Sequence, residues 1–350
     1  NFHNAYVSME GVGGTVSITN NNFTSSLGDY DAFVFYNQLP EPAISGNTFA
    51  NGAEIQVSTS VVSSNRTLGN YQNLPFYGDS IEVGWNNTAS MLTISNGVVL
   101  NNLNLFIRST GGLEADGVTF AYPGNQYQIG LNIEGSANLQ NCDFTGTGAH
   151  LNMSNDSTSK TVNGNNFHDA YISMEGIGGA VSITNNNFTS SLGEYDAFVF
   201  YNQLPEPAIS NNTFANGAKI QVSTSVVSSN RTLDNYQNLP FYGDSIVVGL
   251  NNTASILTIS NGVILNNLKL AIRPTGGLEA DGVTFAYPGN QYQIGLNIEG
   301  SANLQNCDFT GTGAHLNMST DSTNKTVNGN NFHDAYISME GIGGAVSITN

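Results

Sequence analysis

Positive charge is scarce in this 350-residue sequence, which has 8 Lys and Arg residues against 26 Asp and Glu, a net charge of −18. Because phosphate backbones are bound by clustered cations, we expect no nucleic-acid partner. No apolar run approaches the ~18 residues of a membrane-crossing helix, so we expect no membrane span. No charged and apolar leader opens the chain, which begins and ends inside recurring motifs; we interpret it as an excerpt of a longer protein.

What is abundant is Asn, Ser, Thr and Gly, the last at 39 residues, a composition that favours turns and strands over helices. The sequence also repeats itself. Asn1-Phe2-His3-Asn4-Ala5-Tyr6 returns almost unchanged at 166–171 and 331–336, an offset of 165 residues. Such self-similarity indicates a repetitive architecture. We expect one continuous solenoid of repeat 1 (1–165), repeat 2 (166–330) and the start of repeat 3 (331–350).

A shorter motif recurs inside each repeat: an aliphatic residue, a cluster of Asn, Gly or Asp, then Phe or Ile. Examples are Ile183-Thr-Asn-Asn-Asn-Phe188 and Leu304-Gln-Asn-Cys-Asp-Phe309. Successive motifs start 21 to 26 residues apart, seven to a repeat. Alternating apolar residues such as Leu296 and Ile298 follow the motif, as in a strand with one buried face. The pattern predicts an all-β chain with three short strands in each turn of about 23 residues.

The two complete repeats differ at 17 of 165 aligned positions. Cores resist changes of volume and polarity more than surfaces do, so drastic differences mark outward positions. We therefore place four such pairs on the outside: Glu54 with Lys219, Glu82 with Val247, Asn104 with Lys269, and Phe106 with Ala271.

The motif resembles the parallel β-helix repeats of the pectin-lyase-like superfamily over essentially the whole chain. The resemblance implies a right-handed parallel β-helix (β-solenoid) with a ladder of corner Asn side chains and a column of stacked Phe rings inside. The turn that starts at Leu233 and the corner at Gly282 and Val283 depart from the pattern. The ladder would comprise Asn185, Asn211, Asn261 and Asn306, and the core stack Phe167, Phe188, Phe214, Phe285 and Phe309.

Polysaccharide lyases and hydrolases share this fold, and their chemistry needs paired carboxylates or acids beside a basic residue. The nearest candidates are the Asp29/Asp31 and Glu114/Asp116 pairs with Arg108. Their copies are Glu194/Asp196 and Glu279/Asp281 with Arg273. Acids beside Gly are common at corners, and Asp29 is exchanged for Glu194. We therefore expect no enzyme and no catalytic residues.

No metal-ligand spacing joins the five histidines, so we expect no metal site and no cofactor, with weak Ca²⁺ binding at Asp/Gly corners left open. The single cysteine of each repeat, Cys142 or Cys307, is interpreted as a small corner side chain or as an interchain bridge. The two are too far apart along one solenoid to pair with each other.

Two sets of surface residues remain. The segment from Tyr195 through Phe198, Val199 and Phe200 to Tyr201 is either an outward aromatic patch or the core of a widened turn. Candidate glycosylation sites in Asn-x-Ser/Thr sequences are Asn22, Asn65, Asn86, Asn152, Asn187, Asn230, Asn251 and Asn317.

Taken together, these features favour a structural component of an extracellular fibre, filament or cell-surface stalk, built from further copies joined head-to-tail or within one longer chain. An adhesin that binds carbohydrate is the alternative, and a polysaccharide lyase or hydrolase is the third class.

Overall fold

The computed structural model describes residues 1–11, 16–123, 130–147, 149–154, 158–176, 181–288, 295–319, 324–340 and 346–349. It is an all-β chain folded as a parallel β-solenoid of about 14 turns, with roughly 23 residues in each turn. This confirms the predicted fold class. In the described ranges the helical segments are two 3-10 turns, η1 (Trp85–Asn87) and η2 (Leu250–Asn252). Neither of them, nor any other described segment, is a helix long and apolar enough for a bilayer.

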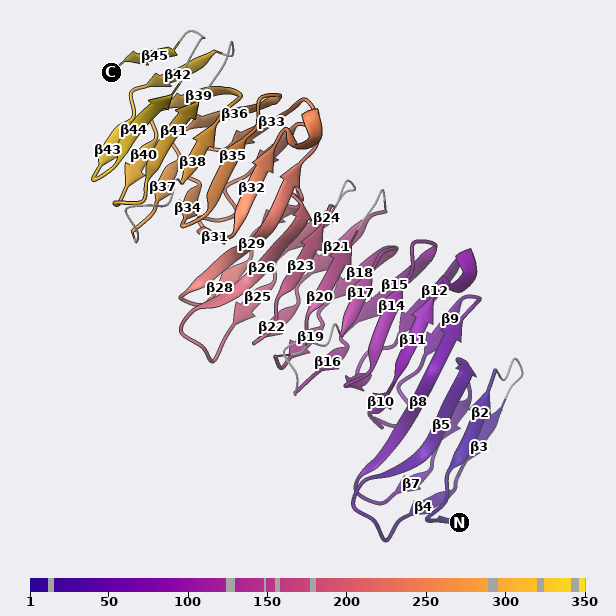
Figure 1. Ribbon diagram of the computed structural model, residues 1–350. Helices are drawn as coiled ribbons and strands as arrows, with labels where there is room; N and C mark the ends of the chain where they lie inside the picture. The colour runs from indigo at the N-terminus through magenta and orange to yellow at the C-terminus, as the bar shows by residue number, and fades with distance from the viewer. Residues whose placement is uncertain are drawn as a thin grey trace. The chain divides into compact units, whose positions relative to one another are not determined.

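The chain divides into two compact units. Unit 1 comprises Asn1–Ile172, Gly179–Gly193 and Asn211–Ala215, and unit 2 comprises Ser173–Gly178, Glu194–Ser210 and Asn216–Asn350. Figure 1 shows short strands stacked side by side from turn to turn within each unit. Each turn supplies one strand to each of three rows.

The rows of unit 1 are as follows. The first holds β1 (Phe2–His3), β4 (Asn22–Thr24), β7 (Thr48–Phe49), β10 (Phe76–Gly78), β13 (Val99–Asn101), β16 (Thr119–Ala121), β19 (Asp143–Thr145), β22 (Asn166–His168), β25 (Asn187–Thr189) and β28 (Thr213–Phe214). The second holds β2 (Val7–Glu10), β5 (Tyr30–Gln38), β8 (Ala53–Val62), β11 (Ser80–Val83), β14 (Asn104–Ile107), β17 (Leu131–Ile133) and β20 (Leu151–Ser154). The third holds β3 (Ser17–Thr19), β6 (Ala43–Ser45), β9 (Arg66–Leu68), β12 (Ser90–Ile94), β15 (Gly111–Asp116), β18 (Ser136–Gln140), β21 (Lys160–Asn163) and β24 (Val181–Thr184). Strand pairing is interrupted near the N-terminal end: β1, β4 and β7 form a sheet of their own, as do β3 and β6, and β10 pairs with β8 of the second row.

Unit 2 repeats this arrangement, and β23 (Ile172–Glu175) contains the boundary between the units. Its first row holds β31 (Phe241–Gly243), β34 (Ile264–Asn266), β37 (Thr284–Ala286), β40 (Asp308–Thr310) and β43 (Asn331–His333). The second holds β26 (Tyr195–Gln203), β29 (Ala218–Val227), β32 (Ser245–Val248), β35 (Lys269–Ile272), β38 (Leu296–Ile298), β41 (His315–Ser319) and β44 (Tyr336–Glu340). The third holds β27 (Ala208–Ser210), β30 (Arg231–Leu233), β33 (Ser255–Ile259), β36 (Gly276–Asp281), β39 (Ser301–Gln305), β42 (Lys325–Asn328) and β45 (Val346–Thr349).

The Phe residues of the motif stack inside the first row. The Phe167 ring lies 4.6 Å from that of Phe144 and 4.7 Å from that of Phe188, nearly parallel to both. Phe214 continues the column at 5.2 Å from Phe188. In unit 2, Phe285 and Phe309 stack at 4.7 Å. These spacings match the separation of neighbouring strands, because residues in register on parallel strands lie directly above one another.

The buried Asn ladder lies one residue later than expected. Asn165 donates its backbone N–H to Oδ1 of Asn186 at 2.9 Å, and Asn186 does the same to Asn212. The expected residues Asn185 and Asn211 are exposed and adopt φ 57°, in the left-handed region. This bend reverses the alternation, so the following residue points inward. Asn261 and Asn306 are likewise exposed, which corrects the ladder assignment.

Cys142 occupies the same inner corner as the ladder residues. Its N–H donates to Oδ1 of Asn165 at 2.8 Å, and its Sγ lies 3.6 Å from the Ala115 carbonyl oxygen. Cys307 makes the corresponding contacts in unit 2. Both thiols are free and buried, and burial raises the pKa of Cys142 to about 11. This placement matches the small corner side chain and not the interchain bridge.

Strands of nine and ten residues, β26 and β29, widen two successive turns of unit 2. Phe198 and Phe200 are fully buried on β26, whereas Tyr195, Val199 and Tyr201 are half-buried. The two phenylalanines are therefore core residues of a widened turn and do not belong to a surface patch.

Candidate functional site

A cavity of about 440 Å³ opens on the surface of unit 1, beside the long strands β5 and β8. We call it the acidic groove. The residues that characterise it are Tyr6, Leu27, Asp29, Asp31, Glu54 and Tyr77. Leu27 is 68% exposed, and its counterpart Leu192 in repeat 2 is 61% exposed. The groove therefore combines carboxylates with an accessible apolar wall.

The strand register sets two of the carboxylates against each other. Asp31 on β5 is the direct partner of Glu54 on β8, and like charges at opposed positions are unfavourable. Burial and the charges of Asp29 and Asp31 raise the pKa of Glu54. The Tyr77 hydroxyl donates to Oδ1 of Asp31, and burial together with this carboxylate raises the pKa of Tyr77. The groove thus holds excess negative charge beside an aromatic ring.

The corresponding residues of repeat 2 hold a cation. Lys219 stands where repeat 1 has Glu54, and it is the direct partner of Asp196 across β26 and β29. Its Nζ pairs with the Glu194 carboxylate and lies 5.1 Å from the centre of the Tyr242 ring. The Tyr242 hydroxyl donates to Oδ1 of Asp196 at 2.5 Å. In repeat 2 the Glu194 carboxylate and the Tyr242 ring therefore accept an ammonium group, with Asp196 beside it.

The second pair of sequence candidates does not come together with Arg108. Glu114 and Asp116 point outward from β15, where Asp116 Oδ1 accepts a hydrogen bond from Asn141 at 2.8 Å. Arg108 instead pairs with Glu82 at 3.1 Å and Glu134 at 3.7 Å. In unit 2, Arg273 pairs with Glu299 at 3.2 Å, away from Glu279 and Asp281.

An aromatic cluster lies on η1 and β14; the sequence placed Phe106 on the outside but did not indicate that it belongs to a cluster. The single tryptophan, Trp85, is 44% exposed. The guanidinium carbon of Arg108 lies 6.0 Å from its ring centre and 5.5 Å from that of half-buried Phe106. We call these three residues the Trp85 platform. Repeat 2 has Leu250 and Ala271 at the aromatic positions, a difference that could have revealed the cluster.

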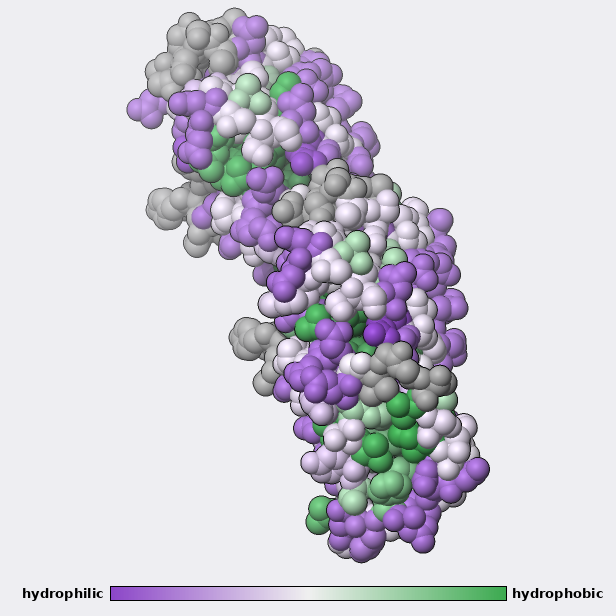
Figure 2. Space-filling view, turned by 90° about the vertical axis from the view of Figure 1, so that its right-hand side faces the viewer, coloured by the Kyte–Doolittle hydropathy of each residue, from purple (hydrophilic) through white to green (hydrophobic). Residues whose placement is uncertain are grey.

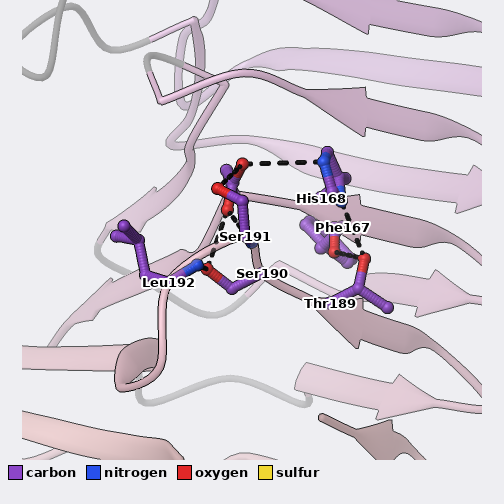
Figure 3. A network of polar contacts seen from close by, with 7 residues as sticks. Phe167, His168, Thr189, Ser190, Ser191 and Leu192 are labelled. Atoms are coloured by element: carbon purple, nitrogen blue, oxygen red, sulfur yellow. Dashed lines mark hydrogen bonds and ion pairs between the residues drawn. The ribbon is translucent and has the colours of Figure 1, made fainter.

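The histidine at the start of repeat 2 belongs to a corner network of unit 1 (Figure 3). His168 lies 3.5 Å from the Asp169 carboxylate and 3.0 Å from the Thr189 hydroxyl. Burial opposes ionisation of Asp169, but hydrogen bonds from Ser190 and Ser191 outweigh it and lower its pKa. The network ties neighbouring corners together. Within the described ranges, no three His, Cys, Asp or Glu residues are grouped as metal ligands would be.

Most candidate glycosylation sites lie on the surface. Asn152 is buried and donates to Asn132 at 3.0 Å, and half-buried Asn317 donates to Asn297 at 2.8 Å. The exposed sites are Asn22, Asn65, Asn86, Asn187, Asn230 and Asn251. On the face in Figure 2, hydrophilic residues cover most of the described surface, and hydrophobic ones gather in separate small areas.

Comparison with known proteins adds little. No family model and no curated protein matches the chain. A solved structure, the catalytic domain of a GH87 alpha-1,3-glucanase variant in complex with tetrasaccharides, is similar at 11% identity and a TM-score of 0.23. The alignment covers 85% of this chain, which spans 63% of the length of that structure. A similarity of this size carries no argument about activity.

Proposed function

We propose that the chain is a structural component of an extracellular fibre, filament or cell-surface stalk, built from tandem solenoid repeats. The supporting observation is that the stack continues without change across a repeat boundary. At the join of repeats 1 and 2, β19 pairs with β22 so that Phe144 lies over Phe167. At the join of repeats 2 and 3, β40 pairs with β43 in the same register, with Phe309 over Phe332.

The inner corner continues in the same way. Cys142 donates to Asn165 and Cys307 to Asn330, each at 2.8 Å, across the two joins. A repeat that meets the next with unchanged pairing can be added without limit, since each turn interacts chiefly with its neighbours. The partners of this proposal are further copies, joined head-to-tail or within one longer chain.

Electron microscopy of the chain and of a version with one more 165-residue repeat tests the proposal. Seven added turns at ~4.8 Å each should lengthen the particle by about 34 Å without widening it. A repeat of scrambled sequence and equal length is the control and should add no such length. Particles that grow equally in all directions would contradict a fibre.

A carbohydrate-binding adhesin is the second candidate, and the Trp85 platform favours it. A sugar ring presents C–H bonds on one face and hydroxyls at its edge, which suit an exposed indole beside a guanidinium and carboxylates. Trp85 and Arg108, with Glu82 paired to the guanidinium, supply these groups. Calorimetric titration with ligands from a glycan array should show binding that Trp85→Ala abolishes and Leu250→Ala leaves intact. Equal loss in both variants would argue against the platform.

We propose no catalytic activity for the chain. The hydroxyls of Tyr77 and Tyr242 bind Asp31 and Asp196, which supports a structural use of these acids. Depolymerisation of a polysaccharide that disappears in an Asp31→Asn, Asp196→Asn double variant would overturn this view.

A further inference from the structure

The acidic groove has an internal counterpart that shows which chemical group it accepts. In repeat 2 an ammonium, the Nζ of Lys219, pairs with Glu194 and lies 5.1 Å from the Tyr242 ring centre. Repeat 1 has the matching acids and ring in Asp29, Asp31 and Tyr77, but a third carboxylate, Glu54, replaces the lysine. The arrangement that holds a cation in repeat 2 thus lacks its cation in repeat 1.

We propose that the acidic groove is a binding site for a primary alkylammonium group, which pairs with Asp29 as Lys219 pairs with Glu194, beside the ring of Tyr77 and close to the charges of Asp31 and Glu54. The exposed side chain of Leu27 lines the same cavity and would contact the attached alkyl chain. This site is additional to the fibre proposal and does not depend on it.

Three physical terms favour this occupant. A cation removes the repulsion between Asp31 and Glu54, which oppose each other in register on β5 and β8. An ammonium near an aromatic face gains further attraction from the ring quadrupole. The ammonium also supplies three hydrogen-bond donors to a site rich in acceptors. Burial first, and then the charges of Asp29 and Asp31, raise the pKa of Glu54, and the second cause agrees with an excess of carboxylate charge in the groove.

A metal ion fits the site less well than an organic cation. Among the residues that the structure describes, Asp29, Asp31 and Glu54 are not close enough together to count as a group of metal ligands. The hydroxyl of Tyr77 already occupies one oxygen of Asp31. An alkylammonium needs no shell of several converging carboxylates, because its three N–H donors can be shared between one carboxylate and water.

Calorimetric titration of the full chain with cadaverine tests the site. We expect saturable binding of one equivalent, with no binding of pentanol, which lacks the charge. Nα-acetyl-lysine methylamide is the second probe. If it binds more tightly than cadaverine, the natural occupant is a lysine side chain of a partner; if cadaverine binds more tightly, the natural occupant is a free diamine. Either order supports the site, whereas no saturable binding of either probe would overturn it.

Charge variants separate the site from general attraction to an acidic protein. Glu54→Gln should weaken cadaverine binding by about tenfold or more, since one close carboxylate is lost. Glu54→Lys should abolish binding by supplying the internal ammonium seen in repeat 2. The matched control is Glu114→Lys, the same charge change on exposed β15, which should leave affinity within about twofold of the parent. Equal weakening by Glu54→Lys and Glu114→Lys would overturn the proposal.

Ring variants and calcium complete the test. Tyr77→Phe keeps the aromatic face and should retain most of the affinity, whereas Tyr77→Leu should lose several-fold. Thermal melting checks that each variant is folded. If Tyr77→Leu is not folded, the cadaverine affinities of the Glu54 variants test the proposal. CaCl₂ should compete no better than NaCl of equal ionic strength. Full displacement of cadaverine by equimolar CaCl₂ would assign the groove to a metal ion instead.

Discussion

Single residues at the corners decide which side chains enter the core. Asn185 and Asn186 are chemically identical neighbours, yet the left-handed conformation of the first leaves it exposed and turns the second inside. Asn186 Nδ2 donates to Oδ1 of Asn212 at 2.9 Å and to the Val162 carbonyl at 3.0 Å. Two residues of the same type therefore take different roles, one in the bend and one in the ladder, because their backbone conformations differ.

Substitution of these two neighbours should have unequal effects. Asn186→Ala leaves the Asn165 N–H and the Val162 carbonyl buried without their partner, and should lower the free energy of unfolding by roughly 3 kcal/mol. Asn185→Gly keeps the left-handed bend and loses one exposed hydrogen bond to Asn163, so it should change stability by about 0.5 kcal/mol at most. Urea unfolding of both variants measures the difference. Equal destabilisation would place the ladder on the wrong residue.

His150 links the stability of unit 1 to pH. Its ring is buried and stacks on Tyr171 at 4.4 Å, and burial lowers its pKa from 6.5. The unfolded state therefore binds the proton more readily than the folded state. Stability from this group is fully present above the unfolded pKa and is lost as pH falls towards the lowered folded value.

We expect His150→Phe, which keeps an aromatic ring for the stack, to flatten this part of the pH profile. Urea unfolding of the parent and the variant from mildly acidic to neutral pH measures the free energy of unfolding at each pH. The carboxylates titrate equally in both proteins, so a difference between the two profiles reports on His150. Parallel profiles of the two proteins would contradict a neutral buried His150.

At the scale of strands and turns, much could be predicted from the sequence. The motif spacing predicts the turns, and period-2 alternation predicts buried strand positions such as Leu296 and Ile298, both of which are buried. The Asn ladder was misplaced by one residue because alternation alone does not show at which residue a bend reverses it. The pairing of Asp31 with Glu54 depends on register between strands about one turn apart, which local patterns do not contain. The exchange of Glu54 for Lys219 was the available signal.

One glycine permits the change of direction between β10 and β11, the two strands that both pair with the long strand β8. Gly78 has φ 131°, and a Cβ there would lie 2.1 Å from the Val57 carbonyl oxygen. Gly78→Ala should therefore destabilise unit 1 by about 2 kcal/mol or more. Gly28→Ala, with no atom within 4 Å of the added Cβ, is the matched control and should be nearly neutral. Thermal unfolding compares them, and a tolerated Gly78→Ala would contradict the close approach.

Over the whole chain, the two repeats keep the inner architecture and vary outside it. The Phe167 ring stacks on Phe144 as the Phe332 ring stacks on Phe309. Cys142 makes the same corner contacts as Cys307. Pronounced differences fall at Glu54 and Trp85, in the acidic groove and the Trp85 platform. A solenoid can change its surface in this way because each turn contributes its core stacking independently of what its outer face carries.

Removal of one whole repeat tests this independence. Deletion of residues 146–310 joins Thr145 to Gly311, whose natural predecessor Thr310 occupies the same place on β40 as Thr145 does on β19. We expect the shortened chain to keep its β-sheet circular dichroism per residue and to unfold cooperatively, with a smaller denaturant m-value because less surface is exposed. Deletion of residues 146–299 instead shifts the strands after the join by about half a turn. The Phe and corner residues would then pack against strands of a different row, and cooperative unfolding should be lost. If both deletions unfold alike, the stacking register between turns is not what holds the chain together.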